Sequence, residues 1–156
     1  MSDALAIHQV SHNFGQFAAL KNVSLTVPRG GFTALLGVNG AGKTTLFSLI
    51  TRLYDNTSGR IEVAGHDLRR EPGAALARLG VVFQSRALDP DLSVAQNLEY
   101  HAALHGIPRR EARLRAAEVL ELVGLSDKLG SRVSALSGGQ SRRAEIARAL
   151  IHRPQI

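Results

Sequence analysis

The segment from Gly37 to Thr44 reads GVNGAGKT, and its spacing, G-x-x-x-x-G-K-[ST], is typical of phosphate-binding loops. Its glycines can adopt left-handed backbone dihedrals, so successive N–H groups can point into one concave nest. The helix expected to follow adds partial positive charge at its N-terminus. We expect Lys43 to bridge the β- and γ-phosphates of a nucleotide and the Thr44 hydroxyl to ligate Mg²⁺. The candidate phosphate-binding residues are Gly37, Asn39, Gly40, Ala41, Gly42, Lys43, Thr44 and Thr45.

A glycine-rich turn that binds nothing is the alternative interpretation of this loop. The loop is preceded by the apolar run FTALL and followed by TTLFSLI, which are the strand and helix flanks that the motif requires. Because both flanks are present, the sequence favours phosphate binding.

A second glycine-rich segment, Leu136 to Gln140, reads LSGGQ and precedes the helix-forming run AEIARAL. Ser137 is a preferred N-cap residue type, and the N–H groups of a helix start can bind an anion. A plain helix cap is the alternative. The candidate ligand-contacting residues here are Ser137, Gly138, Gly139 and Gln140.

The elements that position these segments follow from apolar periodicity and turn signals. Strand-like runs occupy residues 5–10, 22–27, 32–37, 61–65 and 79–84, and a loop surrounds residues 71–73. Helical patterns occupy residues 43–54, 93–105, 109–123 and 137–152, with Ser93 as the N-cap of the second. The order predicts an α/β chain: a β-rich part, a phosphate-loop unit and then a helical part.

Composition excludes several classes of protein. Apolar residues make up 44% and charged residues 21% of the chain, which argues against a disordered segment. No stretch approaches the length of a membrane-spanning helix, the N-terminus lacks the pattern of a signal peptide, and without cysteine no disulfide or cysteine-ligated metal can form.

The net charge of +6 comes mainly from residues 105–156, which carry ten basic and five acidic side chains. These charges interleave with apolar residues, a pattern that favours a solvated helix face over a polyanion-binding surface. Aromatic residues make up only 4% of the chain, which gives little support to stacking on nucleic-acid bases.

Together, the phosphate loop and the LSGGQ segment resemble the ATP-binding cassette (ABC) ATPase family, and the resemblance covers essentially the whole chain. It implies a P-loop NTPase core of an ABC nucleotide-binding domain, with an antiparallel β subdomain and a helical subdomain. The expected parts are a β-rich P-loop part at about 1–84, a helical subdomain at about 85–136 and a signature helix at 137–152. The implied cofactors are ATP and Mg²⁺, and the implied reaction is ATP hydrolysis.

Two further positions take roles from this resemblance. Phe14 lies where the family places an aromatic, usually tyrosine, that stacks on adenine; an aromatic that packs on the core at a turn is the alternative. Gln84 resembles the family's Q-loop glutamine, which contacts Mg²⁺ and the attacking water and links to the transmembrane partner. Val38 replaces a proline that is common in the loop, which leaves the glycines intact.

The resemblance also implies partners. In the family two cassettes stack head-to-tail, so the residues of the signature contact nucleotide on the neighbouring copy. A transmembrane permease is the other implied partner, which would place the chain at the cytoplasmic face of the cell membrane, and a nucleic-acid partner is not expected. Residues 46–70 and 92–107 most resemble ATPases of the ABC-2 exporter type.

The sequence ends in ALIHRPQI, where the family continues into the strand that supplies an acidic magnesium ligand and the catalytic glutamate. We therefore expect these 156 residues to be a C-terminally truncated cassette that is inactive alone. His152 precedes the family's switch histidine and is expected on the helix surface. Two alternatives remain open at this point: a nucleotide-binding fragment without hydrolysis, and a nucleic-acid-associated ABC ATPase.

Overall fold

The computed structural model describes residues 3–156, which form two compact units. The sheet unit runs to Leu79 and includes Gln155 and Ile156; the helical unit comprises Gly80–Pro154. Each unit is described by itself.

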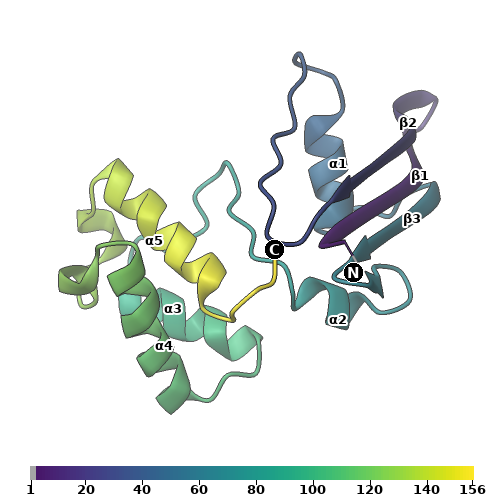
Figure 1. Ribbon diagram of the computed structural model, residues 1–156. Coiled ribbons are helices and arrows are strands. Elements are labelled where there is room, and N and C mark those ends of the chain that lie inside the picture. Colours follow the sequence, from purple (N-terminus) through teal and green to yellow (C-terminus); the bar gives the residue numbers. More distant parts are fainter. Residues whose placement is uncertain (1–2) are drawn as a thin grey trace. The chain divides into compact units, whose positions relative to one another are not determined.

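The sheet unit contains an antiparallel sheet with the strand order β2-β1-β3-β4 (Figure 1). Its strands are β1 (Leu5–Phe14), β2 (Phe17–Val27), β3 (Ser58–Val63) and β4 (His66–Asp67). The β1–β2 hairpin closes where Phe14 pairs with Phe17, and Gly15 in the turn has a φ of +57°. The predicted antiparallel strands at 5–10 and 22–27 are confirmed, and both extend beyond the predicted ends.

Two helices accompany the sheet, α1 (Lys43–Ile50) and α2 (Pro72–Leu76). The buried residues of α1 are Leu46, Leu49 and Ile50. The prediction that this helix continues to residue 54 is wrong, because the chain turns at Thr51 and Arg52 takes a left-handed φ of +56°. α2 forms where a loop was predicted, with Pro72 at its start, a position that proline favours.

Two predicted strands, residues 32–37 and 79–84, are not strands in the structure. Phe32 is 96% exposed and Leu36 is 88% exposed, so the run before the phosphate loop is not packed. A strand requires backbone hydrogen bonds to a neighbour, and within residues 3–156 no segment pairs with either run. Both runs have the apolar composition of strands, but among the described residues they lack the pairing that defines a strand.

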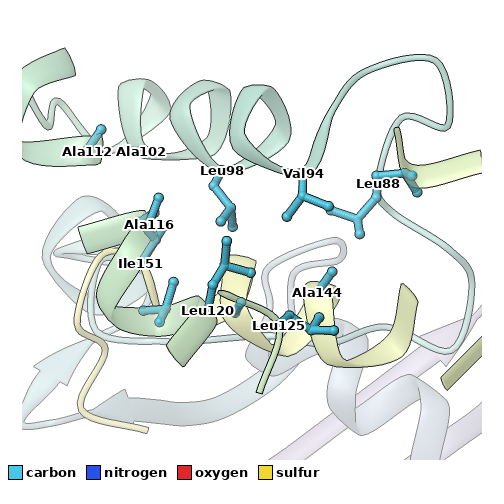
Figure 2. Packing of buried hydrophobic residues seen from close by; sticks show 13 residues of the cluster. Leu88, Val94, Leu98, Ala102, Ala112, Ala116, Leu120, Leu125, Ala144 and Ile151 are labelled. Carbon is cyan, nitrogen blue, oxygen red and sulfur yellow. The ribbon is translucent and has the colours of Figure 1, made fainter. Parts of the chain in front are cut away.

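The helical unit is built from α3 (Val94–Leu104), α4 (Arg109–Leu122) and α5 (Gly138–Leu150), with short 3₁₀ turns η1 (Ser126–Lys128) and η2 (Val133–Ala135). The three predicted helices are confirmed, each within two residues of its expected ends. Their facing sides form an apolar core, part of which Figure 2 shows in close-up. The residues of this core include Leu88, Val94, Leu98, Ala102, Ala112, Ala116, Leu120, Leu125, Ala144 and Ile151.

Helices α3 and α5 begin with the same capping motif, S-x-x-Q. In α3 the Ser93 hydroxyl accepts from the Gln96 N–H, and the Gln96 side chain accepts from the Ser93 N–H. Such reciprocal caps satisfy two N–H groups that the helix itself leaves unbonded. The prediction of Ser93 as an N-cap is confirmed.

Arginines of the helical unit are largely engaged within it. Arg109 and Arg113 both pair with Glu99 at 3.1 and 3.0 Å. Arg153 pairs with Glu118 at 3.0 Å. Much of the positive charge of this region therefore has an internal acidic partner.

His101, His105 and His152 form a histidine cluster in the helical unit. His105 and His152 stack with ring centroids 3.9 Å apart, and the His101 centroid lies 4.9 Å from that of His105 and 5.8 Å from that of His152. All three side chains are half-buried. The expectation that His152 lies on the helix surface is therefore wrong, because its ring packs against the end of α3.

No helix within residues 3–156 combines the length and the apolar character needed to cross a membrane.

Candidate nucleotide-binding site

The phosphate loop surrounds the ammonium group of Lys43, at the first residue of α1. Lys43 Nζ donates to the carbonyl oxygens of Gly37 and Val38 at 2.7 and 2.8 Å. The loop also closes on itself, since the Ala41 N–H donates to the Val38 carbonyl at 3.2 Å. The lysine is thus already centred on the loop, where its charge can attract a phosphate.

Backbone conformation explains why two glycines of the loop are required. Gly40 and Gly42 both have a φ of +84°, in the left-handed region that favours glycine. Gly42 also lies close to β2, where a Cβ would meet Leu20 Cδ2 at 2.7 Å and the Ala19 carbonyl oxygen at 2.8 Å. A Cβ on Gly40 would meet no atom within 4 Å. Gly42 therefore permits a close approach, whereas Gly40 serves only the turn.

We expect Gly42→Ala to lower the free energy of unfolding of the sheet unit by about 2 kcal/mol more than Gly40→Ala. Both variants carry the strain of a left-handed alanine, but only Gly42→Ala adds the clash with Leu20 and the Ala19 carbonyl. Urea unfolding of the two variants measures the difference. Equal losses would show that the loop moves away from β2 without cost.

The donors of this loop fit a nucleotide polyphosphate. Lys43 supplies a positive charge, and the backbone from Gly37 to Ala41 is exposed, so an anion can reach it. The Thr44 hydroxyl is exposed at the helix start and could contribute one oxygen ligand to Mg²⁺; Thr45 is half-buried behind it. The residue types therefore suit both ATP and a phosphate-bound magnesium ion.

Phe14 belongs to an aromatic group with His12 and Tyr54. Its ring meets His12 edge-on at 4.6 Å and Tyr54 edge-on at 5.5 Å, and it remains 45% exposed. Tyr54, after α1, is 49% exposed and was not singled out from the sequence. An apolar side chain with one packed edge and an exposed remainder is compatible with both interpretations of Phe14, a core aromatic and a base-stacking one.

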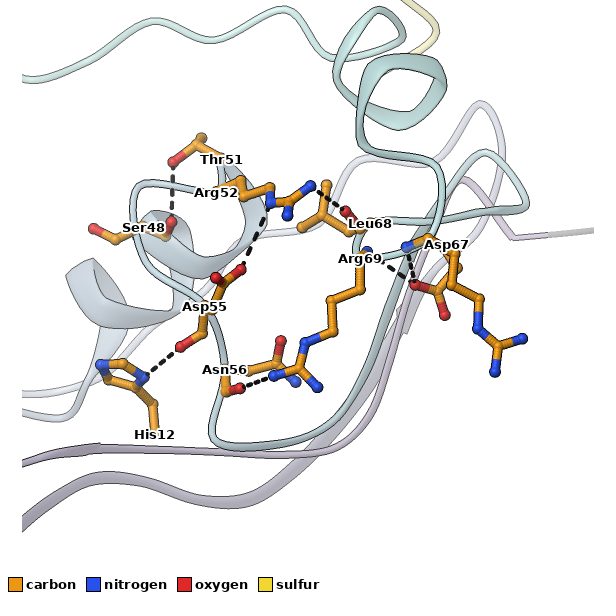
Figure 3. Close-up of polar contacts among 10 residues, drawn as sticks. His12, Ser48, Thr51, Arg52, Asp55, Asn56, Asp67, Leu68 and Arg69 are labelled. Atoms are coloured by element: carbon orange, nitrogen blue, oxygen red, sulfur yellow. Dashed lines mark hydrogen bonds and ion pairs between the residues drawn. The ribbon is translucent and has the colours of Figure 1, made fainter.

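A polar network connects the end of α1 and the turn after it to β1 and to the segment that follows β4 (Figure 3). The Arg52 guanidinium donates to the Leu68 carbonyl at 3.1 Å, and His12 Nδ1 lies 3.0 Å from the Asp55 carbonyl oxygen. Arg69 donates to the Asn56 carbonyl. These bonds engage the arginine side chains with backbone carbonyls, which indicates a structural role in holding the turn after α1.

In the helical unit, the start of α5 presents the LSGGQ segment to solvent. Ser137 Oγ accepts from the Gln140 N–H at 3.3 Å, and Gln140 Oε1 accepts from the Ser137 N–H at 2.9 Å. This cap engages the Gln140 amide and side chain. The cap does not use the Ser137 hydroxyl proton or the N–H groups of the exposed Gly138 and Gly139, so an anion at this helix start could accept from them.

Gln84 is exposed, in a segment held against α5 by two charged side chains. Arg142 Nη1 donates to the Phe83 carbonyl oxygen at 2.6 Å and pairs with Glu145 Oε2 at 2.8 Å. Glu145 Oε1 in turn accepts from the Ala87 N–H at 3.2 Å. The Glu145 side chain is only 4% exposed. We call this arrangement the Arg142–Glu145 clamp.

The predicted site residues are therefore grouped by unit. Phe14 and the phosphate loop lie in the sheet unit, whereas Gln84 and Ser137–Gln140 lie in the helical unit. Within the helical unit, the clamp brings the backbone beside Gln84 to the first turns of the signature helix. The clamp residues were not predicted as functional; the sequence placed Glu145 only inside a helix.

Several known proteins resemble this chain in sequence. Residues 20–156 match the ABC transporter family. The Fe(3+) ions import ATP-binding protein FbpC of Brucella melitensis is 44% identical over 154 residues, which cover 98% of this chain and 43% of FbpC. The daunorubicin resistance ATP-binding protein DrrA3 of Streptomyces coeruleorubidus is 41% identical, with coverage of 98% and 48%. The chain thus spans about half the length of the curated relatives it matches.

Solved structures also resemble this chain. The structure of cbiO1 from Clostridium perfringens, described as part of the ABC transporter complex cbiONQ, has a TM-score of 0.87 at 29% identity, covering 99% of this chain and 63% of cbiO1. The fold is therefore the α/β P-loop NTPase core of an ABC nucleotide-binding domain, as the sequence predicted. Since the family match covers most of the sequence, the chain belongs to the ABC transporter family.

Proposed function

We propose that this chain is the ATP-binding part of an ABC transporter subunit, which couples ATP binding and hydrolysis to transport through a membrane partner. The observation that carries the proposal is the phosphate loop with its centred Lys43 ammonium. The relatives support it, since they are named as ATP-binding proteins of import or resistance systems.

The loop residues would act mainly by binding and orienting the nucleotide. Lys43 would give up its hydrogen bonds to two carbonyl oxygens and donate to phosphate oxygens instead, while the exposed N–H groups of the loop bind the same phosphates. Thr44 would hold Mg²⁺, which neutralises charge on the phosphates when bound. Phe14 would stack on adenine with its exposed part, and the exposed Gln84 amide would orient water at the phosphate.

The signature would act on a second cassette. The exposed N–H groups of Gly138 and Gly139 and the Ser137 hydroxyl form an anion site that suits a nucleotide held by a neighbouring phosphate loop. This proposal implies a head-to-tail dimer at the cytoplasmic face of a membrane, next to a permease. The engaged arginines of the helical unit give no reason to prefer nucleic acid as the partner.

Within this function we propose an ABC-2 exporter-like subtype. Residues 46–70 and 92–107 resemble that type, and DrrA3 and the linearmycin resistance protein LnrL of Bacillus subtilis, 37% identical, are named for resistance. FbpC is named for import at a higher identity. The direction of transport therefore has to be measured in a transport assay with the permease in membrane vesicles. Accumulation of cargo on the side of the membrane where the cassette lies would contradict export.

Nucleotide titration tests the central proposal. We expect Mg–ATP to raise the melting temperature of the protein in a saturable way, while AMP, which lacks the β- and γ-phosphates, has little effect. An equal response to AMP and ATP would contradict phosphate-loop binding.

The two S-x-x-Q caps allow stability and dimer formation to be separated. We expect Ser137→Ala and Ser93→Ala each to cost about 1 kcal/mol of stability, because each removes one N-cap. Only Ser137→Ala should also weaken ATP-dependent dimerisation, since only that cap faces the proposed nucleotide. Chemical denaturation and sedimentation with Mg–ATP measure the two effects. Equal dimerisation of both variants would remove Ser137 from the site.

A further inference from the structure

The proposed function gives no role to any residue of the histidine cluster. His101 is in the last turn of α3 and His105 is the C-cap of the same helix, four residues later. Residues with this spacing share one helix face. His152 follows the end of α5 and brings a third ring to the same place. Two helices thus deliver three imidazoles to a single point of the helical unit.

We propose that His101, His105 and His152 bind a divalent transition-metal ion of the zinc class. One ring nitrogen from each histidine can be chosen so that all three lie within 4.8 Å of one another. Imidazole nitrogen is a preferred ligand of Zn²⁺, Cu²⁺ and Ni²⁺, and three histidines with one open position form a known zinc arrangement.

The rings must rotate to close around the ion. Zn–N bonds of about 2.0–2.1 Å in a tetrahedron place ligand nitrogens roughly 3.4 Å apart. The parallel stacking of His105 on His152 therefore has to open by a small rotation. Both of these residues lie at or beyond a helix end, and all three side chains are half-buried, so rotation does not require the core to repack.

The protonation state of the histidines suits metal binding, because an imidazole that binds a metal ion must be neutral. Burial, followed by the nearby Arg148, His105 and His152, lowers the pKa of His101 to about 4. Burial and His152 also lower the pKa of His105. At neutral pH these two rings are uncharged and keep a lone pair.

Arg148 is the main group that opposes metal binding at the histidine cluster. Its Nη1 lies 3.5 Å from His101 Nδ1, at the outer limit of a hydrogen bond, and its positive charge disfavours a second cation there. Other charges around the cluster are engaged: Arg115 donates to the Ile151 carbonyl, and Arg153 pairs with Glu118. Removing the Arg148 charge should therefore tighten metal binding. If the histidines had a purely structural role, no such gain in metal affinity would be expected.

Calorimetric titration of the untagged protein with Zn²⁺, without nucleotide, tests the proposal. We expect one Zn²⁺ per chain, at least tenfold weaker binding in His105→Asn and His152→Asn, and severalfold tighter binding in Arg148→Met, which keeps an extended apolar side chain. His8→Asn, an exposed histidine of β1, is the matched control and should bind like the parent.

A spectroscopic measurement on the unmodified protein avoids dependence on how the variants fold. Co²⁺ in a site of three imidazoles and water should give the intense visible bands of tetrahedral coordination, and Zn²⁺ should remove them. Absence of these bands together with absence of heat up to millimolar Zn²⁺ would overturn the proposal. Binding that is unchanged in His105→Asn and His152→Asn would overturn it equally.

Discussion

Lys43→Ala should weaken Mg–ATP binding by at least a hundredfold and abolish the thermal stabilisation that ATP gives the parent. The variant removes the only side-chain cation that is hydrogen-bonded within the loop in the described structure, and charge-assisted bonds to phosphate are strong. Calorimetry and thermal melting with Mg–ATP measure both effects.

The matched control is Lys21→Ala, a change of an exposed lysine in β2 that no part of the proposed site uses. It should leave ATP binding as it is. Since the Lys43 ammonium also bonds the loop carbonyls, Lys43→Arg helps to separate charge from geometry: it keeps the charge but not the compact ammonium, and should also bind poorly. Parental ATP affinity in Lys43→Ala would refute the assignment of the phosphate loop.

Glu145→Ala should lower the free energy of unfolding of the helical unit by about 3 kcal/mol, because it removes the buried carboxylate of the Arg142–Glu145 clamp and with it two hydrogen bonds, one from the Arg142 guanidinium and one from the Ala87 N–H. The Ala87 N–H and part of the Arg142 guanidinium lose their acceptor. Glu145→Gln, which can still accept from Ala87, should cost about 1 kcal/mol. Urea denaturation followed by far-UV circular dichroism measures both.

Glu121→Ala supplies the control for this series, since Glu121 is an exposed glutamate on α4 and should change stability by less than about 0.5 kcal/mol. The clamp also predicts a local effect. Hydrogen exchange at Ala87 should accelerate in Glu145→Ala more than exchange in the core of α3. If Glu145→Ala were as stable as Glu121→Ala, the clamp would have no energetic role.

Features that depend on neighbours in the sequence were predicted well. The caps at Ser93 and Ser137 and the apolar face of α4 are encoded within a few residues, so the pattern alone was sufficient. The phosphate loop is equally local, with its lysine and glycines within eight positions. For these elements, residue type and spacing are nearly the whole cause of the structure.

Features that depend on distant segments were missed. Residues 32–37 have the composition of a strand, but strand formation depends on a partner elsewhere in the chain. Glu145 bonds a backbone N–H 58 positions away, and His152 joins two histidines of another helix. No local pattern contains those contacts; the sequence displays only the four-residue spacing of His101 and His105, two of the three histidines in the cluster.

The resting bonds of Lys43 change how nucleotide affinity should be understood. Because the ammonium already donates to two carbonyl oxygens, ATP bound as proposed would compete with these oxygens of the loop for the same donor. The measured affinity then reflects the difference between two sets of bonds, and it is weaker than the bonds to phosphate alone would give. Variants that raise affinity are therefore as readily found by weakening the resting contacts of the lysine as by adding contacts to phosphate.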